Sequence, residues 1–473
     1  MKHAALLAVI FAVAALLVHN KIASAPWGYD EADYMFAASL GIGNNWDDSG
    51  TMPIAQFVST GRRQGTDPQQ RAALSALARS SDDPLVYRHW HGPLYFFYLA
   101  AVSKLGMNEH GIRSCSFAFI ALTALLMYFG SLWILGGTEG QIAAILSSAL
   151  FLWSPVTLQI SELAPHMLFV LIYIGLLLLL TRAESGIGKL CYYAAVCCAA
   201  LAFCTLEVAF VDILLVGIFA WRHRTKLGPH LMRNSIGVFL GTVLIVWPTA
   251  FLKLSFAKAY LVMAYLAVFR KGAWGNVTFS DTWIDRFETS PAEWCLVALA
   301  LIVFFASRRS RMQERSRTGA TIFLLFSGLM ILANIKVYTD ITRYVTVFFA
   351  ALELFTGWIL ARVLAHIARP WLRYGTLAAV CALLIWNAYY GLSGFMTQED
   401  PRPMEMLRAI RENGVAERTL VAPRGYLPIF HYYFPHMHIV GYDSESQIPA
   451  MRDQADAVLY EDASLKMNAP GSR

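Results

Sequence analysis

The sequence predicts an all-α polytopic membrane protein of about eleven transmembrane helices, with a small extracytoplasmic α/β tail. Composition is the first observation behind this class: 57% of the 473 residues are hydrophobic and only 15% are charged. Soluble domains carry about 25% charged residues. The second observation is that basic residues lie between long apolar runs. A nucleic-acid-binding protein would instead gather them on a soluble surface, so no nucleic-acid partner is expected.

The apolar runs define the predicted membrane domain, residues 1–394. A spanning helix needs about 20 mostly apolar residues. The first run resembles a signal peptide, but Pro26 and further runs follow it, so we interpret it as a retained transmembrane helix. The predicted spans are residues 4–20, 112–135, 140–158, 166–181, 190–204, 207–221, 234–251, 292–307, 319–335, 344–364 and 374–394.

Basic residues between the spans predict the orientation. With a cytoplasmic N-terminus, the four basic clusters between the spans fall on the cytoplasmic side, in agreement with the positive-inside rule. The long first loop, residues 21–111, and the tail then lie outside a bacterial-type inner (plasma) membrane. The basic residues concerned are Arg182, Lys189, Arg222, Arg224, Lys226, Arg233, Arg308, Arg309, Arg311, Arg315, Arg317, Arg362, Arg369 and Arg373.

Residues 93–107 form an apolar run of only about 15 residues. This length favours an interfacial helix on the membrane surface over a span. Counting the run as a span would also move every later basic connection to the outside.

The tail, residues 395–473, predicts a separate extracytoplasmic domain. Residues 401–413 read as a helix that ends at Gly414. Three strand-like runs follow, at residues 419–422, 438–440 and 457–460. The mixture indicates a small α/β fold.

Acidic residues follow the first span directly. Asp30, Glu31 and Asp33 stand within four residues of one another at the expected membrane surface. Such residues are costly beside a bilayer unless they face water or a partner. They are either a solvated helix start, with Asp30 as N-cap, or a functional acidic site.

The other end of the same loop is basic and aromatic. Arg88, His89 and His91 precede Pro93 and Tyr95, which open the predicted interfacial helix. Cations at a lipid–water boundary suit a lipid phosphate. Interfacial anchoring is the alternative reading, since aromatic and basic residues are common there.

These motifs, in this order, resemble the GT-C superfamily of polyprenyl-phosphate-sugar-dependent glycosyltransferases. The similarity is greatest to the branch of protein O-mannosyltransferases and lipid A aminoarabinose transferases. An acid in the second outer connection, Glu162, and an Arg343–Tyr344 pair before a long apolar run also fit this family. The sequence departs from the family pattern where Ala164 precedes Pro165, a place where arginine is common.

The resemblance implies one-step, inverting transfer of a sugar from a lipid-phosphate carrier. A carboxylate takes the proton of the acceptor, and cations stabilise the departing phosphate. Asp30 is the candidate base. Glu31 and Glu162 are candidates to position the acceptor or to bind a divalent metal ion, although no cofactor is certain. The candidates for binding the donor lipid and its phosphate are Tyr34, Arg88, His89, His91, Tyr95, His166, Arg270, Lys336, Arg343 and Tyr344.

Other functions remain open at this stage. A transporter or flippase of a lipid-linked sugar would use similar cations, but it would be expected to show repeated halves, and the sequence shows none. A non-catalytic accessory subunit is a further alternative. Glu207, an acid at the junction of two predicted spans, reads either as functional or as a hydrated turn residue. The sugar and the acceptor, whether lipid, glycan or protein, are not indicated.

Overall fold

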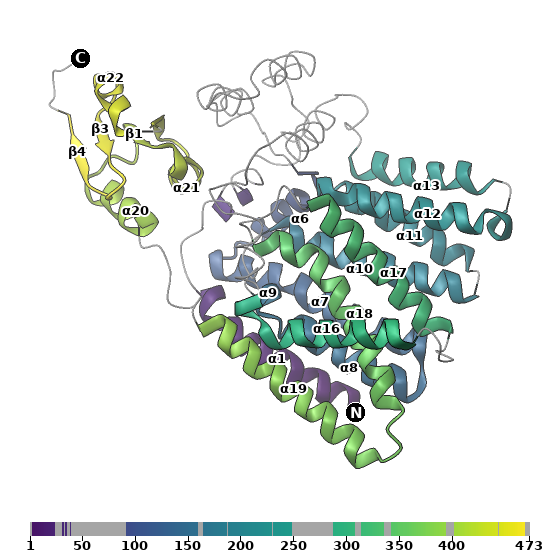
Figure 1. The fold of residues 1–473 in the computed structure, drawn as a ribbon. Coiled ribbons are helices and arrows are strands. Elements are labelled where there is room, and N and C mark those ends of the chain that lie inside the picture. The colour runs from purple at the N-terminus through teal and green to yellow at the C-terminus, as the bar shows by residue number, and fades with distance from the viewer. Residues whose placement is uncertain are drawn as a thin grey trace.

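The computed structural model describes residues 2–23, 31–32, 34–35, 38, 91–158, 164–186, 188–228, 230–247, 287–307, 314–334, 342–393, 402–442 and 444–468. Every structural statement below refers to these residues. Within them the chain forms a large helical domain and a small domain with a β-sheet near its C-terminus, which Figure 1 shows at one side of the helices.

Helices occupy all of the predicted spans. Five of them are long and apolar enough to cross a membrane: residues 109–135, 165–184, 315–333, 347–365 and 370–392. The other helices do not meet this measure over their described residues, so the count of about eleven crossings stays a prediction. The helices are α1 (Lys2–Ala23), α7 (Glu109–Leu135), α8 (Gly137–Leu152), α9 (Pro155–Leu158), α10 (Pro165–Gly186), α11 (Lys189–Phe203), α12 (Phe210–Leu227), α13 (Leu231–Val246), α16 (Pro291–Ala306), α17 (Glu314–Asn334), α18 (Thr342–Ala365) and α19 (Pro370–Ser393).

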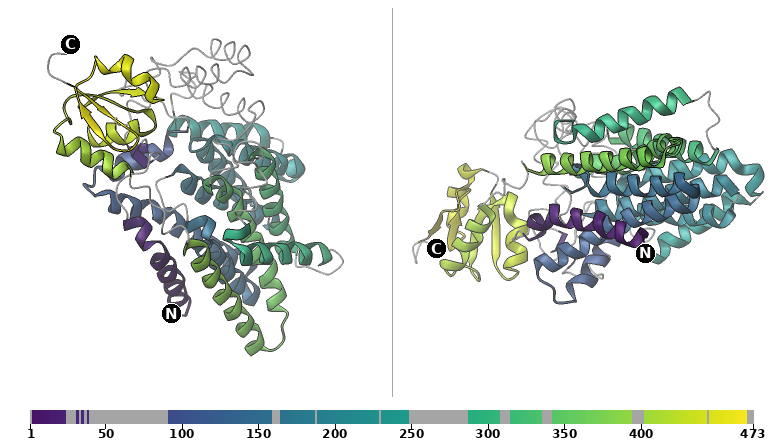
Figure 2. Two further views of the ribbon diagram at one scale, coloured as in Figure 1. Left: turned by 60° about the vertical axis from the view of Figure 1, so that its left-hand side comes forward. Right: turned by 90° about the horizontal axis from the view of Figure 1, so that it is seen from below.

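Helix α18 is central and α19 is peripheral. In the most apolar stretch of each, 89% of the α18 residues are buried but only 28% of the α19 residues. Trp358 of α18 donates from Nε1 to Ser131 Oγ of α7 at 2.8 Å. Figure 2 shows α19 along the edge of the bundle with α1. The exposed apolar face of α19 suits contact with lipid.

The predicted span 140–158 is two helices. α8 ends at Leu152, and Pro155 begins the short α9. A proline lacks the N–H that would continue the helical hydrogen bonding, so it is favoured at a helix start. Between the two helices, Trp153 Nε1 donates to the backbone oxygen of Ile10 at 3.1 Å, which ties the break to α1.

Helix α6 (Leu94–Ser103) occupies the predicted interfacial run. Its ten residues rise about 15 Å, half of a hydrocarbon core. Five side chains are buried, Tyr95 and Phe96 among them. The prediction that this helix lies on the membrane surface stays a prediction, and half of its side chains pack inside the protein.

The C-terminal domain holds a four-stranded sheet in the order β2-β1-β3-β4. Strands β1 (Thr419–Pro423), β2 (His438–Tyr442) and β3 (Ala457–Leu459) pair in parallel and lie at the three strand-like runs of the sequence. Strand β4 (Leu465–Met467) joins antiparallel. The helices are α20 (Arg402–Glu412), α21 (Leu427–Tyr433) and α22 (Ile448–Arg452).

Candidate functional site

The candidate site lies where chain segments far apart in sequence meet near the start of α6. The segments are the described residues 31, 32, 34, 35 and 38, the turn before α6, the first turn of α7, the start of α10, and η1 (Glu207–Ala209), a single 3-10 turn between α11 and α12. Each contributes a polar or aromatic side chain that is largely buried.

Glu31 and Arg113 form a buried ion pair. Arg113 donates from Nε to Glu31 Oε1 at 2.9 Å and from Nη2 to Glu31 Oε2 at 2.6 Å. The two side chains are 5% and 4% exposed. A paired, two-point contact of this kind fixes the orientation as well as the charge. It therefore fixes the backbone next to Asp30.

His91 and Glu207 form a second charged contact. His91 Nδ1 donates to Glu207 Oε2 at 2.8 Å, and the two side chains are 9% and 3% exposed. A carboxylate on one ring nitrogen holds the ring in one orientation and settles which nitrogen of the neutral ring carries the proton. The His91 ring therefore has a fixed orientation in this site.

Aromatic rings surround His91. The His166 ring lies edge-on to it, with centroids 6.0 Å apart, and the Tyr34 ring lies at 6.2 Å. Tyr34 also meets Tyr95 edge-on at 6.1 Å. Burial raises the pKa of Tyr95, so its hydroxyl keeps its proton at neutral pH. The rings limit the movement of His91.

A close backbone approach holds α6 in place. Leu94 N donates to Cys204 O at 3.0 Å. A Cβ atom on Gly92 would lie 2.2 Å from that same oxygen and 2.9 Å from Thr205 N. Only glycine fits at this position.

We expect Gly92→Ala to displace α6 together with His91. The added methyl group would clash with backbone atoms, which cannot move away by changing rotamer. The free energy of unfolding should therefore fall by more than about 1–3 kcal/mol. The melting temperature of the purified protein measures this loss. Gly217→Ala is the matched control, because Gly217 lies in a helix with no atom within 4 Å of the new Cβ. Equal melting temperatures for the two variants would contradict the close packing.

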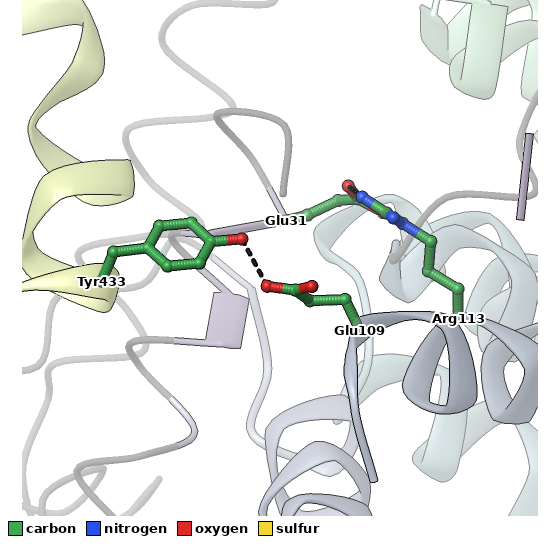
Figure 3. A network of polar contacts seen from close by, with 4 residues as sticks. All are labelled: Glu31, Glu109, Arg113 and Tyr433. Atoms are coloured by element: carbon green, nitrogen blue, oxygen red, sulfur yellow. Dashed lines mark hydrogen bonds and ion pairs between the residues drawn. The ribbon is translucent and has the colours of Figure 1, made fainter. Parts of the chain in front are cut away.

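The C-terminal domain reaches the edge of the site. Tyr433 Oη donates to Glu109 Oε1 at 2.6 Å (Figure 3). Glu109 lies one turn before Arg113 on α7, and Figure 3 shows Arg113 and Glu31 meeting beside this contact.

The structure brings together five of the residues singled out in the sequence: Glu31, Tyr34, His91, Tyr95 and His166. Arg343 and Tyr344 lie in the first turn of α18, where side chains are not described. The remaining candidates lie outside the described residues: Asp30, Arg88, His89, Glu162, Arg270 and Lys336.

Arg113 is a site residue that the sequence analysis missed. The signal was available, because a basic residue inside a predicted span calls for a buried partner. Glu207 was noticed, but its partner His91 lies 116 residues away. No local pattern indicates such a pairing.

The described residues do not fit a divalent-ion site. No three His, Cys, Asp or Glu residues among them are grouped as metal ligands. Arg113 occupies both oxygens of Glu31, the described member of the expected pair. The mechanism below uses no metal ion.

The fold is similar to that of solved structures of ArnT and of an archaeal oligosaccharyltransferase. The chain is similar to ArnT from Cupriavidus metallidurans in the apo state, with a TM-score of 0.60 and 12% identity over 96% of this chain and 89% of that chain. For ArnT bound to undecaprenyl phosphate the TM-score is 0.60 and the identity 14%, over 95% of this chain and 88% of that chain.

A third structure is more distant. The apo oligosaccharyltransferase of Archaeoglobus fulgidus gives a TM-score of 0.54 and 12% identity over 94% of this chain and 65% of that chain. No protein-family model matches the sequence. No functionally curated protein matches it either. The similarity is therefore one of fold.

Proposed function

We propose that this protein is a membrane glycosyltransferase that moves a sugar from a polyprenyl-phosphate-linked donor to an acceptor on the extracytoplasmic face. The main support is that the buried Glu31–Arg113 and His91–Glu207 pairs lie together, at the two ends of the long first loop, in a chain with the GT-C fold. A related structure of that fold is bound to undecaprenyl phosphate.

In the proposed reaction, a hydroxyl or amine of the acceptor attacks the anomeric carbon of the donor. The bond between that carbon and the phosphate oxygen breaks, and the lipid phosphate leaves with the electron pair. Asp30 takes the proton of the nucleophile. The Glu31–Arg113 pair holds the backbone that carries Asp30.

Negative charge grows on the phosphate as it leaves. His91, oriented by Glu207, is placed to stabilise this charge together with Arg343 near the start of α18. Arg88 and His89 adjoin His91 in sequence and would add to the same positive region. Attack from the side opposite the phosphate inverts the anomeric configuration.

Mass spectrometry of cell-envelope glycans and lipids, with and without this protein, tests the function. We expect one class of lipid, glycan or protein to lose a single sugar residue in its absence. Purified protein should then restore that sugar from a lipid-linked donor in vitro. Transport of the donor across vesicles without transfer would instead identify a flippase. Restoration only with a second protein present would identify an accessory subunit.

The proposed orientation places the site on the extracytoplasmic side. Cysteines introduced near Arg224, Arg311 and Arg369 should be protected from an impermeant thiol reagent added outside, whereas cysteines near Gly65 and Asp443 should be labelled. The reason is that the basic connections share one side. Labelling measured on intact spheroplasts shows which connections face the outside. Modification of the three basic loops from outside would overturn both the orientation and the location of the site.

A further inference from the structure

One short hydrogen bond joins the two domains, whose buried apolar side chains also belong to a single hydrophobic cluster. Tyr433, the last residue of α21, donates to Glu109 in the first turn of α7 at 2.6 Å. The guanidinium of Arg411, on α20, lies 5.9 Å from the Tyr433 ring centroid and 5.8 Å from that of Phe434. The ring of Tyr433 is therefore packed within the C-terminal domain, and its hydroxyl contacts α7.

The same contact adjoins the buried ion pair. Glu109 and Arg113 are four residues apart on α7, so they share one face of the helix. Arg113 interacts electrostatically with both Glu109 and Tyr433. The Tyr433–Glu109 hydrogen bond and the Arg113–Glu31 pair thus lie side by side (Figure 3).

The C-terminal domain has buried packing that does not include Tyr433. Val421, Tyr442, Ile448, Ala455 and Val458 form one cluster within it. Tyr442 Oη also donates to Leu459 O at 3.1 Å across the sheet. The hydroxyl of Tyr433 points instead to the other domain, so its bond to Glu109 concerns how the two domains dock.

We infer that Tyr433 is a positioning residue for the transfer reaction. By binding Glu109 it holds the C-terminal domain against α7, one helical turn from Arg113, and it helps to keep the Glu31–Arg113 pair in its working geometry. This inference rests on the proposed function. It makes the C-terminal domain a part of the active site.

The test is Tyr433→Phe, which removes only the hydroxyl. We expect kcat per folded molecule to fall about tenfold, because small displacements of a reacting group cost rate, while KM for a long-chain polyprenyl-phosphate sugar stays unchanged. The double variant Tyr433→Phe with Glu109→Ala should lose no more kcat than either single variant, because all three variants break the same hydrogen bond. Glu109→Gln keeps an acceptor oxygen and should lose less than Glu109→Ala.

Tyr460→Phe is the matched control, because Tyr460 stacks with Lys466 within the C-terminal domain. Its kcat should equal that of the wild type. A second readout needs no activity: spin labels on unnatural amino acids at Lys104 and Glu417, both exposed, report the distance between the domains. The distribution should be narrow in the wild type and in the control but broad in Tyr433→Phe.

Each result decides something. A narrow distribution in Tyr433→Phe overturns the docking role, whatever the activity. A broad distribution with unchanged kcat overturns the positioning role. If the wild type transfers no lipid-linked sugar, the proposed function fails, and the distance measurement still decides whether Tyr433 docks the domain.

Discussion

Arg113→Met should destabilise the protein by about 3–5 kcal/mol, because it leaves the carboxylate of Glu31 buried without its cation. Arg113 is the described side chain that satisfies both oxygens of Glu31. Methionine keeps much of the volume, so the loss measures the charge and its hydrogen bonds more than the packing. Denaturant unfolding of the purified protein in detergent measures the difference in free energy.

Two comparisons separate the ion pair from general damage. Arg113→Met combined with Glu31→Met removes both charges and should regain much of the lost stability, since a buried pair replaced by apolar residues is often neutral. Arg222→Met is the matched single control. Its side chain is 70% exposed and lies 3.5 Å from Glu184, so its loss should stay within about 1 kcal/mol. A double variant as unstable as the single one would show that the pair does not act as a unit.

The positions of the helices could be read from the sequence because each depends on a local run of apolar residues. The division of residues 140–158 into two helices could also have been read, since Pro155 stands inside that run. Whether the shorter helices cross the membrane depends on the surrounding lipid and on neighbouring helices, and composition alone does not decide it.

The site could be predicted only in part. Glu31 and His91 were found because acids and cations beside a membrane are unusual. Arg113 and Glu207 act through partners 82 and 116 residues away along the chain. Their roles follow from how helices pack, which short motifs do not encode. The bond of Tyr433 to Glu109 spans 324 residues and had no signal in the sequence.

Strand β4 shows a different limit. Strand β4 (Leu465–Met467) has only three residues and pairs with one strand, β3. A segment this short shows no alternation of apolar and polar residues that would predict a strand. The turn before it contains Ala463 at φ 64°, a conformation that normally indicates glycine or asparagine. The pairing with β3 supplies the backbone hydrogen bonds that local preference does not.

Asp30→Asn is the variant expected to affect turnover most. It keeps the shape of the side chain but removes the base, so kcat should fall about 10²–10⁴-fold. Expression, melting temperature and binding of the lipid-linked donor should be preserved, because the adjacent Glu31–Arg113 pair is intact. Steady-state transfer with a defined donor and acceptor measures the loss.

The competing interpretation predicts the opposite result from the same change. If Asp30 is only a helix N-cap, asparagine should replace it without loss, since the two residues are nearly equal at that position. Asp33→Asn makes the same change three residues further on and should leave turnover close to that of the wild type. Full activity of purified Asp30→Asn would remove Asp30 from the mechanism. Glu162 would then be the leading candidate for the base, because the predicted topology brings it to the same side of the membrane.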